Sequence, residues 1–387
     1  MVAVKWLAVG LAVATTAAVA AGAPGDVGVA VAGYKPVTDV SEQARLDLDI
    51  RAMERAGSNW AAARRVYTNG ANSNLSGSVK RTLQSFSTKY NKPGPLRSEP
   101  AAVAAKRFWG NWDYADRHMK AVLAGADSGK FGRYRTGALA KTDAARKQMV
   151  KKLIKFTFIP QYVGHEMQLA LTEYAIGKSY EEATEHWDEA WVFYAGSLEK
   201  GTGNGFSAYI LAEKRSKNFG TRSGDRSSVN RRMLTAFKAG QAALRGPGRG
   251  AAALRATKCI RALLLVPVIQ GCLRYAYRVS DVKVSPPAAL AKESAETWAF
   301  CAAALPALAA VDAAAARRVR AQTFLAGVPK PRISWPVVRA AFGATALNKM
   351  GLRCADVGSL NVEYPAAKHP VCRDGRLSNA DAGTNFC

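Results

Sequence analysis

Two stretches of the sequence, 107 residues apart, share one pattern, and this internal repeat constrains the fold more than any other feature. The shared residues are a proline, a glycine and the aromatic motif E-x-W-x-F. In the first copy they are Ile159, Pro160, Gly164, Glu189, Trp191, Phe193 and Leu198, and in the second Val266, Pro267, Gly271, Glu296, Trp298, Phe300 and Leu305. Each copy therefore predicts a long helix interrupted at its proline, followed by a second helix that carries E-x-W-x-F.

The rest of the chain also favours helices. It is rich in Ala, Leu, Lys, Arg and Glu, its apolar residues recur at spacings of three and four, and alternating runs are few. Helix start signals occur at Ser41, Ser179, Ser285 before Pro286, and Ser334. We therefore predict an all-α protein without need of strands, in which two tandem divergent repeats form a helical-bundle array. The predicted segments are a first repeat at 39–220, a second at 221–352 and an irregular cysteine-bearing tail at 353–387.

The first residues form a secretory signal pattern. Lys5 provides a short basic start, an apolar run begins at Trp6, and small residues suited to cleavage lie between Ala20 and Ala23, so residues 1–23 are predicted to be a signal peptide. All six cysteines follow it, and none shows the close C-x-x-C spacing of a zinc site. In an exported chain they predict up to three disulfides, with the pairing left open. Asn74 lies in the one glycosylation sequon.

The acidic residues gather in the first copy of the repeat, although the protein as a whole has a net charge of +26. Between Gln161 and Ala195 there are seven acids against one base, Lys178, together with two of the four histidines. These residues are His165, Glu166, Glu173, Glu181, Glu182, Glu185, His186, Asp188 and Glu189. Their counterparts in the second copy are mostly neutral or basic: Cys272 replaces His165, Leu273 replaces Glu166, and Lys292 replaces Glu185. The aromatic and proline positions therefore indicate architecture, whereas the carboxylates and imidazoles belong to one copy.

Carboxylate and imidazole groups are ligands for hard and borderline cations, and iron suits a mixed oxygen and nitrogen site without thiolates. On a helix that starts at Ser179, the spacing of Glu182, His186 and Glu189 places them in one stripe within about 60° of arc. Glu166 and Glu173 share a face of the preceding helix, and His165 points about 100° away from Glu166. We predict a metal site from two antiparallel helices, with the candidate ligands His165, Glu166, Glu173, Glu182, Glu185, His186 and Glu189.

A purely structural role remains an alternative for these residues. Glu182 completes a capping box with Ser179, Glu181 and Glu185 favour the positive end of the helix dipole, and Asp188 is expected to point toward solvent. The acids can equally pair with bases such as those of ARKQMVKKLIK, residues 145–155. His118 is expected to be structural, and His369 has no neighbouring ligands in the sequence.

Catalytic motifs are missing at the spacings that they require. His165 and Glu166 do not continue into HExxH, and there is neither a GxSxG elbow nor a phosphate-binding glycine loop. The paired Glu-x-x-His of ferritin-like di-iron oxidases is missing too, because Ala183 stands three residues before His186. We therefore expect a binding protein and no catalytic residues, with an exported metal-dependent enzyme as a weaker alternative.

Export also changes the meaning of the positive charge. Outside the cell the partners of a basic surface are polysaccharides, membrane surfaces and small anions such as metal chelates, so nucleic acid is not expected. The same charge is also compatible with a merely solvated surface.

Several motifs of the chain resemble a known family. DVSEQARLDLDIRAMERAGSNW, YTNGANS, RTLQSFSTKY, GHEMQLAL and EEATEHWDEAWVFYAG resemble the low-iron-inducible periplasmic proteins of green algae, the iron-assimilating proteins, over roughly Asp39 to Gly351. The resemblance implies an exported, soluble protein that helps to concentrate iron near the cell surface for a separate reductase and permease system. Its acidic and histidine positions are similar to those at His165, Glu166, Glu182, Glu185, His186 and Glu189.

Together these observations predict a non-catalytic protein of the periplasmic space or wall that is not embedded in the membrane. Its basic surface would gather iron or anionic iron chelates, and its acidic cluster would take up the metal. Proton competition should weaken binding below about pH 5 to 6. The alternative function is that of a surface protein which binds anionic cell-wall polysaccharide and has no role in metal binding.

Overall fold

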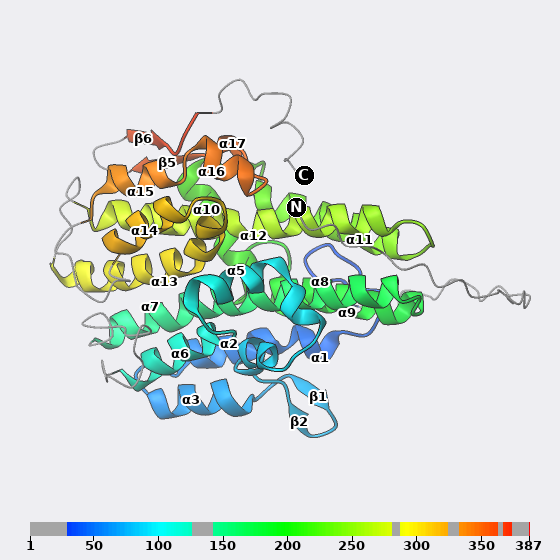
Figure 1. The fold of residues 1–387 in the computed structure, drawn as a ribbon. Helices are drawn as coiled ribbons and strands as arrows, with labels where there is room; N and C mark the ends of the chain where they lie inside the picture. The colour runs from blue at the N-terminus through cyan, green and yellow to red at the C-terminus, as the bar shows by residue number, and fades with distance from the viewer. Residues whose placement is uncertain (1–28, 126–141, 281–286, 324–332, 363–366, 374–386) are drawn as a thin grey trace, which may run out of the picture.

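The computed structural model describes residues 29–125, 142–280, 287–323, 333–362, 367–373 and 387. Helices dominate these residues, which confirms the all-α prediction. Strands occur only as three short antiparallel hairpins among the described residues. Figure 1 shows the long helices running roughly parallel in stacked layers, with α1–α3 on one side, α7–α9 in the middle and α11–α13 beyond them. The predicted signal peptide, residues 1–23, lies outside the described residues.

The short helices of the N-terminal layer cover one side of the central pair, whereas α5 (Pro100–Trp109), from the same part of the chain, packs mainly against α13. Asn59 and Glu99 begin two of these helices as N-caps, and each side chain accepts a hydrogen bond from the backbone N–H three residues on. The segment 68–97 contains one hairpin, a short helix and two 3-10 turns, Lys89–Asn91 and Pro95–Ser98. The elements are α1 (Ser41–Ala44), α2 (Leu46–Arg55), α3 (Trp60–Asn69), β1 (Asn74–Ser76), β2 (Val79–Lys80), α4 (Ser85–Thr88), α5 (Pro100–Trp109) and α6 (Tyr114–Ala124).

The central layer contains the first proline interruption. Helix α7 (Asp143–Leu153) passes through a π-helical turn, Ile154–Phe158, into α8 (Ile159–Ala175). Pro160 has no N–H for the carbonyl four residues earlier and its ring crowds that carbonyl, which accounts for a local widening of the helix. The segment Ile176–Ser179 then reverses the chain into α9 (Tyr180–Ala195), which packs against α8 along its length.

The third layer contains the counterparts of these helices at the offset of 107. Helix α12 (Gly250–Arg278) runs through Pro267 without a break, so the predicted interruption at this proline is wrong. It packs against α13 (Pro287–Val311). The starts of α7 and α12, and of α9 and α13, are each 107 residues apart. Element bounds alone do not establish a duplication, so the tandem repeat stays a prediction. The other elements of this layer are α10 (Tyr209–Phe219), β3 (Arg222–Ser223), β4 (Arg226–Ser227), α11 (Ser228–Leu244), α14 (Ala313–Gln322), α15 (Trp335–Ala341) and α16 (Ala344–Lys349).

Three disulfides fasten the second half of the chain, in agreement with the predicted upper limit. They join Cys259 to Cys387, Cys272 to Cys301 and Cys354 to Cys372. The second of these links α12 to α13. Within the tail, the described residues form α17 (Cys354–Val357) and a hairpin of β5 (Ser359–Val362) and β6 (Ala367–Pro370). The tail is therefore more regular than its sequence indicates.

Glycines allow the layers to approach closely. A Cβ on Gly240 of α11 would lie 1.9 Å from the indole of Trp187, and one on Gly271 of α12 would lie 2.0 Å from the ring of Phe300. The large aromatic side chains therefore rest directly on helix backbones. Such close packing fixes the lateral position of α9 and α13.

Among the described residues, one helical stretch is long and apolar enough to cross a membrane. It is Ala289–Val311 of α13, which has a mean hydropathy of 1.3 and is 72% buried inside the protein over its apolar part. A core helix of a soluble protein meets the same criteria of length and composition, and the extensive burial of α13 is typical of one.

Candidate metal centre

The candidate site lies between the antiparallel helices α8 and α9. A capping box fixes the start of α9, because the Ser179 hydroxyl accepts from the Glu182 N–H and the Glu182 carboxylate accepts from the Ser179 N–H. On the inner side of α9, Trp187 and Trp191 are fully buried. This packing turns the neighbouring edge of α9 toward α8, where the acidic residues of both helices meet.

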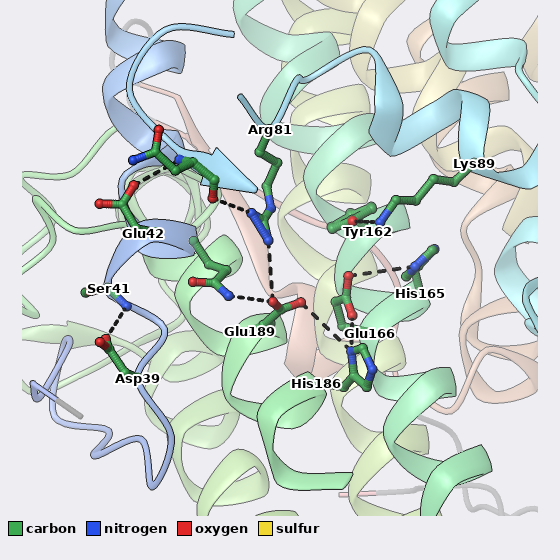
Figure 2. Close-up of polar contacts among 12 residues, drawn as sticks. Asp39, Ser41, Glu42, Arg81, Lys89, Tyr162, His165, Glu166, His186 and Glu189 are labelled. Carbon is green, nitrogen blue, oxygen red and sulfur yellow. Dashed lines mark hydrogen bonds and ion pairs between the residues drawn. The ribbon is translucent and has the colours of Figure 1, made fainter. Parts of the chain in front are cut away.

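Three side chains converge there. Glu166 of α8 and His186 and Glu189 of α9 each offer a ligand atom within 4.8 Å of the other two. The Glu166 Oε2 atom lies 2.7 Å from His186 Nδ1, and the Glu189 Oε2 atom lies 3.9 Å from the same nitrogen. Figure 2 shows the three side chains pointing toward one another. The prediction that two antiparallel helices bring Glu166 to the His186 and Glu189 stripe therefore agrees with the geometry.

Glu173 extends the cluster toward solvent. Its Oε1 atom lies 3.4 Å from His186 Nε2, while its Oε2 atom is buried with no hydrogen-bond partner among the described residues. The side chains of His186 and Glu173 are each 26% exposed, whereas that of Glu166 is only 2% exposed. The site is therefore closed at Glu166 and accessible along His186 and Glu173.

His165 adjoins the cluster from behind. Its Nε2 atom lies 3.7 Å from Glu166 Oε1, and its ring stacks on that of Tyr162 at a centroid distance of 4.6 Å. Burial lowers the pKa of His165 to about 4, so the ring is neutral at neutral pH. His165 therefore contacts Glu166 but does not belong to the group of Glu166, His186 and Glu189.

Basic and polar side chains from the N-terminal layer close the other side. Arg81 lies 3.5 Å from the Glu189 carboxylate, and Gln43 of α1 donates a hydrogen bond of 2.7 Å to the same oxygen. Lys89 donates a hydrogen bond to the Tyr162 hydroxyl (Figure 2). The contacts from Arg81 and Gln43 hold Glu189 in place before any cation binds.

The charges of the cluster depend on one another. Burial by itself would lower the pKa of His186, but its hydrogen bond with Glu166 and the charges of Glu166, Glu189 and Glu173 raise it to about 9. Burial raises the pKa of Glu189 to about 7, with a further rise from the charge of Glu166 and opposing effects of Arg81 and Gln43. Burial would raise the pKa of Glu166 as well, but the hydrogen bond from His186 and the nearby imidazoles lower it below its usual value. At neutral pH a protonated His186 therefore stands between carboxylates.

This donor set fits a divalent or trivalent first-row metal ion. Two carboxylates and an imidazole nitrogen supply oxygen and nitrogen ligands, which iron, manganese and zinc accept. A cation would replace the proton on His186, because an imidazole nitrogen must be unprotonated to coordinate a metal. The proton and the metal ion therefore compete for the same nitrogen atom of His186.

Two predicted ligands lie elsewhere. Glu182 is exposed, bonded to Ser179 in the capping box and to Lys178 at 2.7 Å, and Glu185 is exposed on the outer side of α9. Neither belongs to the three-residue group. The structural alternative therefore describes Glu182 better than the metal-ligand prediction does.

The expectation that Asp188 points toward solvent is wrong. Asp188 is fully buried and accepts hydrogen bonds from the Tyr34 hydroxyl, the N–H groups of Val37 and Thr38, and the Gln241 amide. The Asp188 carboxylate of α9 therefore connects the segment before α1 to Gln241 of α11. The reason is that this N-terminal segment covers a face of α9 that looks exposed from helical periodicity alone.

The remaining histidines and the sequon are separate from the centre. His118 is buried among Trp109, Tyr114 and Trp298, and burial lowers its pKa to about 3, which agrees with a structural role. His369 packs against Tyr277. Asn74 is half-buried in the β1–β2 hairpin, and its side-chain oxygen accepts from Lys80. Its glycosylation stays a prediction.

Sequence reasoning missed the partners that come from the N-terminal layer. Gln43, Arg81 and Lys89 lie more than seventy residues before the cluster, and nothing in their local pattern marks them as neighbours of Glu189 or Tyr162. Their one sequence signal is that they fall in or beside motifs that carry the family resemblance.

The comparison with protein families gives one match. A family model described as low iron-inducible periplasmic protein matches residues 7–372, which extends the resemblance noted in the sequence at both ends. No curated protein and no solved structure matches the chain.

Proposed function

The chain belongs to the low iron-inducible periplasmic protein family, and from that premise we propose that it binds iron as cargo between α8 and α9 without transforming it. The protein is periplasmic, as the family description states. Glu166, His186 through its Nδ1 atom, and Glu189 are the proposed inner ligands. Glu173 faces the other ring nitrogen, Nε2, and is proposed to receive the metal at the entrance before it reaches them. His165, Glu182 and Glu185 are not part of the proposed inner set.

One observation carries the proposal: three ligand-type side chains from two helices converge within 4.8 Å in a largely buried place. Burying carboxylates costs free energy unless a cation or hydrogen-bond donors compensate them. In this site the compensation at Glu166 comes mainly from a proton on His186, which a metal ion can displace. The site is therefore preorganised for a cation.

Capture and release follow from the same geometry. We propose that the basic surface attracts anionic iron chelates and that Glu173 and His186, the more exposed ligands, receive the metal first. Transfer to a membrane reductase and permease system would reverse these steps. Contact with anionic wall polysaccharide is a further use of the same positive charge.

The absence of catalysis is also part of the proposal. The family is not a known enzyme family. Arg81 and Gln43 contact the Glu189 carboxylate and occupy one side of the site. Among the described residues, the three-residue group contains one imidazole, that of His186. This arrangement suits storage or transfer of an ion rather than its use on a substrate.

Metal titration tests the proposal. Calorimetry with ferrous iron without oxygen, and with ferric nitrilotriacetate, should detect one site in the wild-type protein. The variant Glu166→Gln, His186→Gln, Glu189→Gln should lose it, whereas Glu181→Gln, Glu182→Gln, Glu185→Gln, with exposed residues of the same helix replaced, should retain it.

Equal iron binding by both variants would reject the site. A wild-type protein that takes up no iron in either form, yet elutes from cell walls only at high salt, would support the polysaccharide-binding alternative instead.

A further inference from the structure

A cavity lies on the other side of α8 from the metal centre. It has a volume of about 420 Å³ and is enclosed by α5, the turn into α8, α12 and α13, with Met350 at one side. Gln161 faces this cavity and Glu166 faces the metal centre, and five residues correspond to about 140° around a helix. The two sites are therefore separated by the body of α8.

The walls of this cavity are mostly apolar. Alanine, leucine, valine and proline side chains predominate, with Phe156 and Tyr114 as the aromatic members. The volume falls within the range of about 300–1,000 Å³ that is typical of small-molecule sites. An apolar body is the part of a ligand that such walls would bind, because its transfer from water is favourable.

Irregular helix geometry converges on the same place. The π-helical turn Ile154–Phe158 contributes Phe156 and Thr157, and Pro160 and Pro306 line the cavity from α8 and α13. Isolated π-helical turns are uncommon and occur often at functional sites. The turn at Thr157 widens the helix where the cavity adjoins it.

Two polar side chains inside the cavity lack hydrogen-bond partners. Gln161 is 6% exposed, and neither its amide nitrogen nor its amide oxygen has a partner among the described residues. Thr157 is 5% exposed, and its hydroxyl oxygen is likewise unpartnered there. A buried polar group without a partner is unfavourable, so these three atoms indicate a place for a polar group of a ligand.

The other polar groups of the cavity are already satisfied or lie at its edge. The fully buried Glu99 carboxylate accepts from the Ala102 N–H and from Arg261 Nε. Gly164 allows this approach, since a Cβ there would lie 3.2 Å from the Glu99 carboxylate. Lys258 and Leu254, both exposed, stand at the rim. The unmet hydrogen-bonding capacity is thus concentrated at Gln161 and Thr157.

We propose that this cavity binds a small, largely apolar organic molecule whose hydroxyl or carboxyl head hydrogen-bonds to Gln161 and Thr157. A hydroxyl head, or a carboxyl head bound in its protonated form, offers both a donor and an acceptor, which matches the amide nitrogen and oxygen of Gln161 together with the Thr157 hydroxyl. The apolar body fills the space between α5, α12 and α13. This site is independent of iron binding between α8 and α9.

Three probes with one apolar chain test the role of the head group: decan-1-ol, decanoic acid and decane. Calorimetric titration of the full-length protein should show binding of at least one of the first two that is at least about tenfold tighter than binding of decane, which corresponds to the loss of one or two hydrogen bonds. The variant Ala307→Phe, which fills the cavity, should bind none of them.

The shape-matched variants Gln161→Leu and Thr157→Val separate ligand binding from folding. Each should weaken binding of the head-bearing probe by about tenfold and should raise the Tm of the ligand-free protein, because a buried unsatisfied group is removed. Iron uptake should not change, since the metal ligands face away.

Three results would overturn the proposal. They are no binding of any probe, equal affinity for decane and both head-bearing probes, and a lower Tm in Gln161→Leu, which would mean that the amide already has a structural partner.

Discussion

The pairs α8–α9 and α12–α13 differ mainly in what holds their facing sides together. In the first pair, Glu166 and His186 meet across the interface at 2.7 Å. In the second pair, a disulfide joins Cys272 to Cys301, and Leu273 occupies the position that corresponds to Glu166. Both pairs bury the aromatic residues of E-x-W-x-F. The two helix pairs therefore have the same aromatic packing, but only α8–α9 has a carboxylate and an imidazole at these corresponding positions.

The carboxylates of the two pairs are compensated in different ways. In the second pair Glu293 pairs with Arg278 and Glu296 pairs with Lys152 at 3.1 Å. These cations are covalent parts of the chain, and a metal ion cannot take their place. In the first pair the cation next to Glu166 is the proton on His186, which can leave. A site that exchanges cations thus requires a removable charge, and the first pair alone has one at this position.

Removal of the disulfide should give the largest effect. The variant Cys272→Ala, Cys301→Ala opens a loop with a sequence separation of 29 residues, for which the chain-entropy estimate is a loss of about 3.5 kcal/mol of unfolding free energy. Denaturant unfolding measures it. Iron affinity should stay unchanged, because the metal centre lies in the other pair, and a parallel loss of iron binding would show that the two pairs are not independent.

Glu166→Leu makes the first pair resemble the second, since leucine stands at the corresponding position 273. Loss of an inner carboxylate should weaken iron binding by at least about 100-fold, beyond the 10- to 100-fold typical of indirect partners. Calorimetric titration measures the change. Glu181→Leu on the exposed surface of α9 is the matched control, and an equal loss in both variants would contradict the assignment.

The pH dependence distinguishes a removable proton from a fixed cation. His186 has a pKa of about 9, so affinity for ferrous iron should rise about tenfold for each pH unit up to that value, and more steeply below about pH 7, where Glu189 is also protonated. This window is higher than the pH 5 to 6 expected from unperturbed side chains. Anaerobic titrations between pH 6 and 9 measure the slope, and a flat profile would contradict the competition.

The same pKa fixes the sign of the stability change without metal. His186 has a folded-state pKa above its unfolded value of 6.5, so its stabilising contribution is complete below that value and is lost as the pH rises through about 9. Unfolding of His186→Gln should lack this part of the pH dependence. Replacement of the distant His369 by glutamine serves as the control.

The capping box should give the smallest effect. Ser179→Ala removes one cap hydrogen bond at the start of α9 and should reduce the unfolding free energy by about 1 kcal/mol. Iron affinity should remain within about twofold of the wild type. A large loss of affinity would mean that the start of α9, and with it Glu182, belongs to the metal centre.

The helical class was predictable because its signals are local. The capping box at Ser179, the spacing of Trp187 and Trp191 on one face, and the proline at 160 each act within a few residues. The approach of Glu166 to His186 followed from one short connection between antiparallel helices. Interactions of this range are the ones that periodicity and start signals describe.

Contacts that span long stretches of the chain were not predictable. Asp188 is buried because residues 34–38 fold over it, and Glu189 is held by Gln43 and Arg81 from the N-terminal layer. The cysteine pairing also depends on how the tail returns to α12 at Cys259. Such contacts are set by tertiary packing, for which a single sequence contains no periodic signal.

The most direct test of the metal centre is anomalous diffraction at the iron absorption edge from crystals of the protein loaded with iron. The predicted result is one strong peak between the carboxylates of Glu166 and Glu189 and the Nδ1 atom of His186. A peak at another position, or a loaded protein with no peak between α8 and α9, would contradict the claim that this helix pair holds the iron.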